Sequence, residues 1–210
     1  MNILSNYLSI KNNISILSNN KKLVVVTKNY NINQISPLIN VGHVDFGENR
    51  VQEASDKWSN LILLNNNIQL HLIGSLQSNK AKQAFNLFSY IHSLDSQKLA
   101  KIFSDLERSL EKKIKYFIQV NIAEEKQKSG VQINQLADFV NYCVKDLNLN
   151  VLGLMCIPPV NSDSEQFFRT LKELNIKNGL KDLSMGMSAD YKLGIKYGSN
   201  FVRIGSAIFK

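Results

Sequence analysis

Lys28 is the residue whose type and position could most directly support covalent chemistry. It follows an apolar, β-branched run over residues 23–27 that is typical of a parallel strand buried on both faces. The carboxyl ends of such strands are where α/β proteins place their reactive groups. A neutral lysine amine at that edge can attack a carbonyl carbon. The alternative is a strand-ending lysine that extends its ammonium into water.

Two segments near the C-terminus combine glycine with hydroxyl groups and could bind an anion. Residues 184–188 (Ser-Met-Gly-Met-Ser) and Gly205-Ser206 each follow a short apolar segment. Glycine lets the backbone approach a phosphate closely, and serine hydroxyls add hydrogen-bond donors. The alternative is ordinary turn structure.

Four further polar residues stand in or beside apolar segments. Arg203 either pairs with a carboxylate as a structural element or contacts a ligand. Asn49 either caps a helix or reaches the same site. His71 and His92 lie in apolar strands, where a histidine is more often a hydrogen-bonded core residue than a ligand. The sequence has neither metal-ligand spacing nor a nucleophile-elbow signature.

These residues need a scaffold that brings the two ends of the chain together. Apolar segments begin near residues 23, 44, 69, 90, 115, 149, 183 and 200, with helical patterns in the connections. Eight such units predict an α/β fold, a single (β/α)8 TIM-barrel domain over residues 1–210. An open doubly wound sheet is the alternative, but a Gly-x-Gly-x-x-Gly motif is missing after the first strand.

Local patterns predict how the barrel is completed. Residues 3–18 form an additional, amphipathic N-terminal helix. Asp95 caps the helix that follows the fourth strand, and another helix begins at Met187-Ser188. The chain reaches Lys210 too soon after the last strand for a final helix, so we expect the N-terminal helix to cover that gap.

Composition limits the classes of function. The 210-residue chain carries a formal net charge of +8, but its basic residues are scattered and form no nucleic-acid-binding signature. We expect neither a nucleic-acid partner nor a membrane span, since no apolar run approaches the required length of about 20 residues. Cys143 and Cys156 lie in apolar contexts and indicate reduced thiols in a cytoplasmic protein. We expect a monomer.

The candidate residues together favour a pyridoxal phosphate site. The amine of Lys28 would condense with the aldehyde, and burial beside another cation would favour the neutral amine. The two glycine-hydroxyl segments would hold the phosphate. Arg203 would face the pyridine nitrogen, and a permanent cation there makes the ring a weak electron sink.

The sequence also resembles a known family, the YggS/PROSC proteins or pyridoxal phosphate homeostasis proteins. The matching segments lie in the family's order over residues 22–209. They are residues 26–28 (Val-Thr-Lys), 46–49 (Phe-Gly-Glu-Asn), 51–53 (Val-Gln-Glu), 71–74 (His-Leu-Ile-Gly), 76–80 (Leu-Gln-Ser-Asn-Lys), 120–122, 128–130, 153–155, 157–158, 183–188 (Leu-Ser-Met-Gly-Met-Ser) and 202–209 (Val-Arg-Ile-Gly-Ser-Ala-Ile-Phe).

The resemblance implies a barrel like the N-terminal domain of alanine racemase that binds pyridoxal 5'-phosphate. It aligns Lys28 with the Schiff-base lysine and places Ser188, Arg203, Gly205 and Ser206 on cofactor-holding segments. It implies a role in vitamin B6 homeostasis without robust turnover, with pyridoxal phosphate-dependent apo-enzymes as partners.

Two other functions remain open from the sequence. One is a racemase-like enzyme, which the absence of a second domain carrying an opposing base disfavours. The other is a barrel enzyme that acts on a phosphorylated substrate without pyridoxal phosphate.

Overall fold

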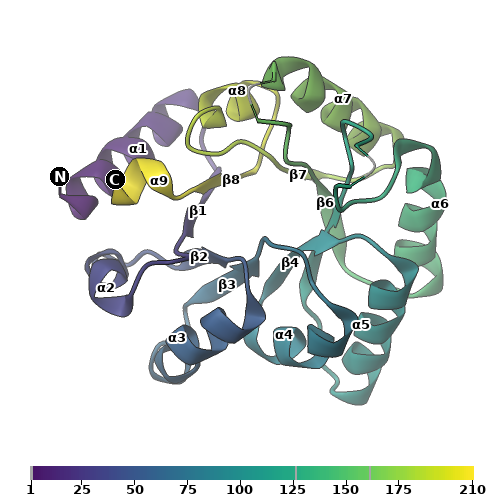
Figure 1. Ribbon diagram of the computed structural model, residues 1–210, viewed down its shortest axis with the longest axis horizontal. Coiled ribbons are helices and arrows are strands. Elements are labelled where there is room, and N and C mark those ends of the chain that lie inside the picture. Colours follow the sequence, from purple (N-terminus) through teal and green to yellow (C-terminus); the bar gives the residue numbers. More distant parts are fainter. Residues whose placement is uncertain (1, 126, 161) are drawn as a thin grey trace.

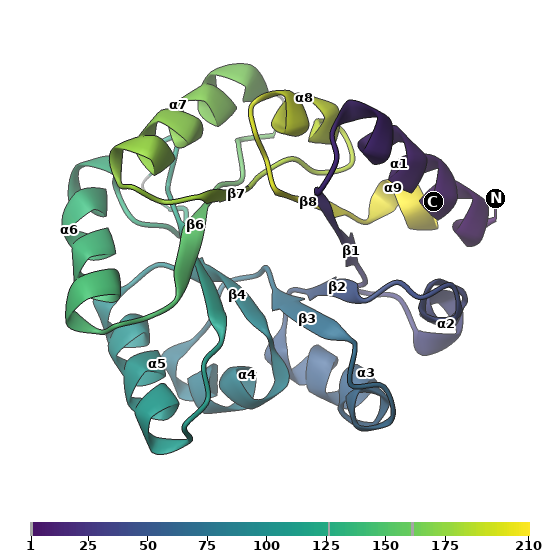
Figure 2. The ribbon, with the colours of Figure 1, turned by 180° about the vertical axis from the view of Figure 1, so that it is seen from behind.

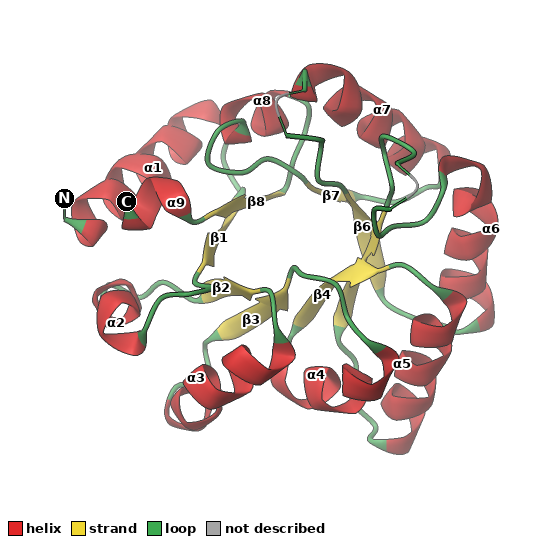
Figure 3. Ribbon diagram, in the orientation of Figure 1, coloured by secondary structure: helices red, strands yellow, loops and turns green. Residues whose placement is uncertain are grey.

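The computed structural model describes residues 2–125, 127–160 and 162–210. Eight parallel strands close into a barrel in sequence order, and helices surround them (Figures 1 and 3). The (β/α)8 barrel expected from the alternating pattern is therefore confirmed, and the open sheet is excluded.

The strands that form the barrel wall are short. They are β1 (Lys22–Val26), β2 (Asp45–Glu48), β3 (Gln69–Leu72), β4 (Tyr90–Leu94), β5 (Lys115–Gln119), β6 (Val151–Met155), β7 (Asp182–Ser184) and β8 (Phe201–Ile204). The α-helices are α1 (Ile3–Leu17), α2 (Ile32–Asn40), α3 (Val51–Leu64), α4 (Ala81–Leu87), α5 (Gln97–Ser109), α6 (Leu136–Asn141), α7 (Ser164–Lys177), α8 (Tyr191–Lys196) and α9 (Ser206–Phe209).

The pairing of β8 with β1 closes the barrel. Lys22 lies opposite Phe201 and Val25 lies opposite Ile204, so the first and last strands run in register. Closure leaves neither strand with an unpaired edge. It also places the carboxyl end of β1 beside the carboxyl end of β8.

The core has two layers, one on each side of the barrel wall. A large layer lies between the strands and the helices, and Trp58, Phe85 and Phe103 are among its fully buried members. A smaller layer fills the barrel interior and contains Val24, Tyr90, Phe117, Met155 and Phe201. Both layers pin the strands, so residues just beyond the strand ends have fixed positions.

The ends of the chain meet on the outside of β1 and β8. Both views of the ribbon place α1 beside the short helix α9 (Figures 1 and 2). The side-chain amide of Asn6 donates to the Ile208 carbonyl at 3.1 Å, and the rings of Tyr30 and Phe209 stack with centroids 4.1 Å apart. The expected absence of a helix after β8 is therefore wrong, because one turn fits before Lys210. The additional N-terminal helix is present and packs against that turn.

Two local expectations also need correction. The N-cap of α5 is Ser96, whose hydroxyl accepts from the Leu99 N–H, rather than Asp95. The helix expected to begin at Met187 begins at Tyr191 instead. Residues 188–190 form a turn because the Asp190 carboxylate accepts from the Met187 N–H at 2.7 Å, an aspartate turn that competes with helix.

His43 connects α1 to β2. Its Nδ1 atom lies 3.1 Å from the Tyr7 hydroxyl and its Nε2 atom lies 2.9 Å from the Asp45 carbonyl. A carbonyl only accepts, so Nε2 carries the proton and Nδ1 accepts from Tyr7. Burial lowers the pKa of His43 to about 4 from an ordinary value of 6.5, so the folded protein holds this ring neutral.

We expect this histidine to make folding sensitive to mild acid. The unfolded chain binds a proton at His43 below pH 6.5, whereas the folded chain does so only near pH 4, so stability is lost as pH falls between these values. Urea unfolding at pH 7 and pH 5 measures the effect. The loss should be about 2 kcal/mol larger in the wild type than in His43→Gln. Equal losses in the two proteins would contradict a neutral buried His43.

Candidate functional site

Three loops meet at the carboxyl end of the barrel. Gly205 follows β8 so closely against β1 that an added Cβ atom would lie 3.1 Å from the Val26 carbonyl oxygen. The N–H of Arg203 donates to the Gly186 carbonyl at 2.9 Å, which ties β8 to the loop after β7. Lys28 lies two residues beyond Val26, so the lysine and both glycine-hydroxyl segments share this end of the molecule.

Lys28 itself is exposed at the mouth of the barrel. The expected burial beside another cation is therefore not observed, because Lys28 lies beyond the last strand residue rather than among the interior side chains. Its amine is accessible to a ligand that enters the mouth. The backbone on either side of it is held by contacts with β2 and α3.

The segment before Lys28 is fixed by a buried ion pair. The carboxylate of Glu48, which is fully buried, accepts from the Thr27 hydroxyl at 2.7 Å, from Lys57 at 2.8 Å and from the Trp58 ring N–H at 2.9 Å. The Lys57 ammonium also donates to the Thr27 carbonyl at 2.8 Å. Thr27 is thus held through both its side chain and its backbone.

The segment after Lys28 is fixed by a second carboxylate on α3. Asn29 turns the chain with a φ of +66°, which asparagine tolerates better than most residues. Its N–H donates to the Glu53 carboxylate at 2.8 Å, and Lys57 donates to the same oxygen at 3.2 Å. Partial burial raises the pKa of Glu53, but these two donors outweigh it and hold the carboxyl below its usual range. Lys57 therefore joins Glu48 to Glu53. We call these three residues the clamp.

The loops after β7 and β8 are joined by a serine. The N–H of Ala207 donates to the Ser188 hydroxyl oxygen at 3.2 Å. Ser188 is half-buried and Ser206 is exposed. Gly186 has a φ of +90°, and an added Cβ atom would lie 2.9 Å from the backbone of Tyr191, so the close turn here requires glycine.

Arg203 lies inside the barrel, with 3% of its surface exposed. Its guanidinium donates to the Ser184 hydroxyl at 2.6 Å and to the Cys156 carbonyl at 2.8 Å. Within residues 2–125, 127–160 and 162–210 it has no ion pair with a carboxylate, so the structural-pair interpretation is wrong for the described chain. Burial lowers the pKa of Arg203 to about 10, which leaves it a cation at neutral pH.

Asn49 does not cap α3, because the N-cap position belongs to Arg50 and carries no side-chain cap bond. It is half-buried in the loop after β2, where its carbonyl would lie 2.3 Å from a Cβ atom at Gly74. It borders a cavity of about 400 Å³ together with Gln77 and Lys80. Asn49 therefore stands at the same end of the barrel as Lys28, on the side of β2 and β3.

The two strand histidines are core residues, as their apolar setting indicated. His71 and His92 are fully buried and lie 2.9 Å apart, Nδ1 to Nε2. Among the described residues no cluster of three or more His, Cys, Asp or Glu side chains could hold a metal ion. The described helices also contain none long and apolar enough to cross a membrane. The cysteine thiols are buried, and burial raises the pKa of each to about 12.

Comparison with known proteins decides the family. A family model described as the alanine racemase N-terminal domain matches residues 2–210. The chain belongs to the alanine racemase N-terminal domain family.

Curated members of this family resemble the chain over most of their length. A pyridoxal phosphate homeostasis protein of Pasteurella multocida is 36% identical over 198 residues, which span 90% of this chain and 85% of that protein. One of Schizosaccharomyces pombe is 37% identical over 203 residues, which span 90% and 84%. One of Escherichia coli K12 is 34% identical over 196 residues, which span 89% and 84%. These relatives confirm the resemblance seen in the sequence motifs.

Solved structures of the family agree with the fold. PipY of Synechococcus elongatus with pyridoxal phosphate bound has a TM-score of 0.90 and 29% identity, and covers 99% of this chain and 100% of that chain. An alanine racemase of Corynebacterium glutamicum has a TM-score of 0.70 at 17% identity over 98% of this chain and 59% of that chain. The second likeness shows the shared barrel alone.

Sequence reasoning missed the residues that fix the backbone around Lys28 and the loop after β7. Glu48, Glu53 and Lys57 form the clamp around Lys28, and Asp190 orders the loop after β7. The i,i+4 spacing of Glu53 and Lys57 on one helix was the available signal. It predicts a surface pair, whereas Lys57 lies over the end of β1 with a side chain only 9% exposed.

We expect Lys57→Met to destabilise the protein by about 3 kcal/mol, because it leaves the buried Glu48 carboxylate without its cation. Glu48→Gln in the same chain should recover part of the loss. Urea unfolding measures both values. Lys101→Met is the matched control, since the Lys101–Asp105 pair is about half exposed and should cost under about 1 kcal/mol. A loss at Lys57 no larger than the control would contradict the clamp.

Proposed function

We propose that this protein binds pyridoxal 5'-phosphate and takes part in its intracellular homeostasis, with residues 1–210 as a single cofactor-binding barrel domain. The observation that carries the proposal is the meeting of Lys28, the glycine-hydroxyl loops and Arg203 at one end of the barrel. Relatives at 34–37% identity are named pyridoxal phosphate homeostasis proteins, and PipY has been solved with pyridoxal phosphate bound.

The donors between β7 and β8 suit the phosphate of the cofactor. Ser188 uses an oxygen lone pair to accept from Ala207, so its O–H can still donate to an anion. Ser206 is the first residue of α9, so its N–H has no partner within that helix. Gly205 presents backbone without a side chain. These groups are uncharged, and they would bind the phosphate through hydrogen bonds instead of an ion pair.

Arg203 suits the pyridine nitrogen of the cofactor. Its guanidinium is cationic, buried and held by two acceptors, so it can only donate to that nitrogen. Because the Arg203 guanidinium keeps its proton, the pyridine nitrogen that accepts from it stays unprotonated. Pyridoxal phosphate supplies an electron sink when its ring nitrogen is protonated, and this arrangement weakens that property.

Lys28 suits the covalent link. Its neutral amine would attack the aldehyde carbon, form a carbon–nitrogen double bond and release the oxygen as water. The clamp of Glu48, Lys57 and Glu53 fixes the backbone around this residue and leaves the side chain exposed. Asn49, at the same end of the barrel, completes the set of proposed cofactor-binding residues.

We further propose that the protein holds the cofactor rather than turning over a substrate. Lys28 is open to water, and exclusion of water is what protects reactive carbanions in racemases. The names of the relatives describe homeostasis. The proposal includes a cytoplasmic monomer that exchanges pyridoxal phosphate with dependent apo-enzymes. The buried free cysteines suit a reducing compartment.

Titration of the purified protein with pyridoxal phosphate should produce a visible absorbance band. Lys28→Ala should abolish the band and weaken binding at least tenfold, because the covalent link is lost. Lys21→Ala, at the opposite end of β1, is the matched control and should behave as the wild type. A band of equal strength in Lys28→Ala would overturn the assignment of the lysine.

Alanine stereochemistry followed over hours with the cofactor-loaded protein should show no turnover above that of Lys28→Ala. The electron sink is weak and the site is open, so the α-proton of an amino acid is not removed efficiently. A racemase of related fold serves as the positive control. Robust racemisation that disappears in Lys28→Ala would establish the racemase-like alternative in place of a carrier.

A further inference from the structure

A continuous chain of hydrogen bonds crosses the barrel interior from Arg203 to Asp45. Arg203 lies 2.6 Å from the Ser184 hydroxyl, and that hydroxyl lies 2.8 Å from His92 Nδ1. His92 Nε2 lies 2.9 Å from His71 Nδ1, and His71 Nε2 lies 3.0 Å from the Asp45 carboxylate. The chain uses β8, β7, β4, β3 and β2, so it links strands on opposite sides of the barrel.

The fixed roles of the two ends, together with the neutrality of the two buried rings, set the direction of every bond. A guanidinium can only donate, so the Ser184 oxygen accepts from Arg203, and the Ser184 O–H donates to His92 Nδ1. A carboxylate can only accept, so His71 Nε2 carries a proton. Burial keeps His71 neutral, so its Nδ1 has no proton and accepts from His92 Nε2. Each neutral ring therefore carries its single proton on Nε2.

The surroundings of the two rings support that assignment. His71 stacks on Tyr90 with centroids 4.2 Å apart, and His92 stacks on Phe117 at 4.6 Å. Burial lowers the pKa of both histidines, and for His92 the neighbouring His71 and Arg203 lower it further. Burial raises the pKa of Asp45, but His71 and Lys22 outweigh it and hold the carboxyl below its usual range.

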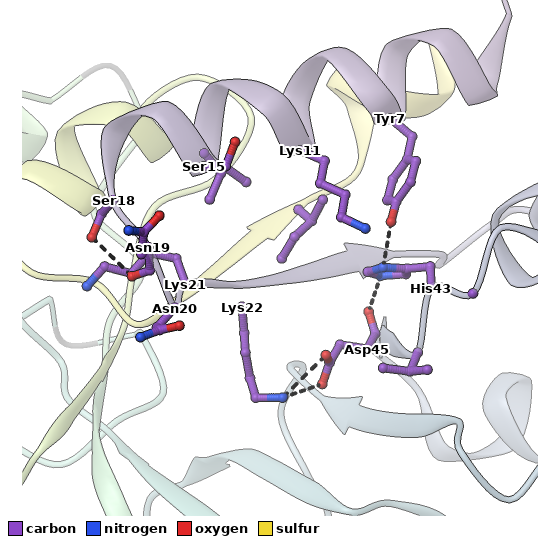
Figure 4. Close-up of a pocket in the computed structure, with 14 residues that line it drawn as sticks. Tyr7, Lys11, Ser15, Ser18, Asn19, Asn20, Lys21, Lys22, His43 and Asp45 are labelled. Atoms are coloured by element: carbon purple, nitrogen blue, oxygen red, sulfur yellow. Dashed lines mark hydrogen bonds and ion pairs between the residues drawn. The ribbon is translucent and has the colours of Figure 1, made fainter.

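The Asp45 end of the hydrogen-bond chain borders a cavity at the other end of the barrel from Lys28. A cavity of about 580 Å³ lies at the amino ends of the strands, and Asp45 and Lys22 line it together with Tyr7, Lys11 and His43 (Figure 4). Lys22 points across this cavity to Asp45 and pairs with it at 3.3 Å (Figure 4). Asp45, the anionic end of the hydrogen-bond chain, thus borders a cavity at the amino ends of the strands. Arg203, the cationic end, lies on the side of the proposed cofactor site.

We infer that Asp45 is a positioning residue for Arg203, acting through His71, His92 and Ser184. The carboxylate orients His71, and His71 orients His92. His92 Nδ1 then accepts a hydrogen bond from the Ser184 hydroxyl, so that a lone pair of the hydroxyl oxygen faces the guanidinium. The inference rests on the proposed function, since it assigns the chain to holding the cation that meets the cofactor ring. Each hydrogen bond has one fixed donor, so the hydrogen-bond chain orients Arg203 and transfers no proton to it.

The direction of the chain can be read from the histidines of the cofactor-free protein. The protein has three histidines, so a long-range nitrogen–proton correlation spectrum gives three imidazole patterns. At pH 7, His71 and His92 should both be neutral with the proton on Nε2. A proton on Nδ1 of either ring, or a doubly protonated ring, would overturn the inference.

Two variants test whether the chain reaches the cofactor. Ser184→Ala breaks the bond next to Arg203 and should weaken pyridoxal phosphate binding about tenfold. Asp45→Asn can donate as well as accept, so it should populate the other tautomer of His71 and His92, weaken binding about threefold and shift the visible band of the bound cofactor.

Tyr7→Phe is the matched control, because it changes a hydrogen bond at His43 beside the same cavity but outside the chain. It should leave the tautomers of His71 and His92, the affinity and the band unchanged. Amide spectra that match the wild type show that each variant is folded. If Asp45→Asn behaves as Tyr7→Phe in all three readouts, the inference is wrong. A wild-type protein that fails to bind pyridoxal phosphate would overturn the proposed function instead, and the tautomer spectrum distinguishes the two failures.

Discussion

The pairing of β1 with β8 determines how the loops at the carboxyl end of the barrel are arranged. It joins residues about 180 positions apart in the sequence and brings the end of β1, with Lys28 beyond it, against Gly205. Without closure, the amine and the donors of the last two loops would lie on separate edges of an open sheet. The packing of α1 against α9 covers this seam from outside, and Asn6 and Tyr30 hold the last turn in place.

The polar residues around this seam divide into two systems that serve different purposes. On the outside of the barrel, Glu48 and Lys57 fix the backbone before Lys28. Inside the barrel, Arg203 and Asp45 are joined through a hydroxyl and two histidine rings. Each of the two charged groups therefore has a hydrogen-bond partner. A buried charge without such partners would be costly, which explains why each charged end is met by donors or acceptors of fixed position.

Local sequence patterns predict the barrel well, because a fully buried strand needs an unbroken apolar run and each connection carries a helical period. They also single out Lys28 and Arg203, since a charged residue at the end of such a run or within it is conspicuous. The apolar pattern predicts the start of α8 four residues too early, because an aspartate turn at Asp190 competes with helix by a single side-chain bond. The partners of Arg203 lie 19 and 47 residues away, and no local pattern encodes such contacts.

The central claim is that Lys28 holds pyridoxal phosphate covalently at the mouth of the barrel. Borohydride reduction of the cofactor-loaded protein, followed by peptide mapping with mass spectrometry, tests it most directly. We expect a pyridoxyl group on the peptide that contains Lys28, and on no other lysine, at one equivalent of cofactor. A label on another lysine, or no label in a protein that binds the cofactor, would contradict it.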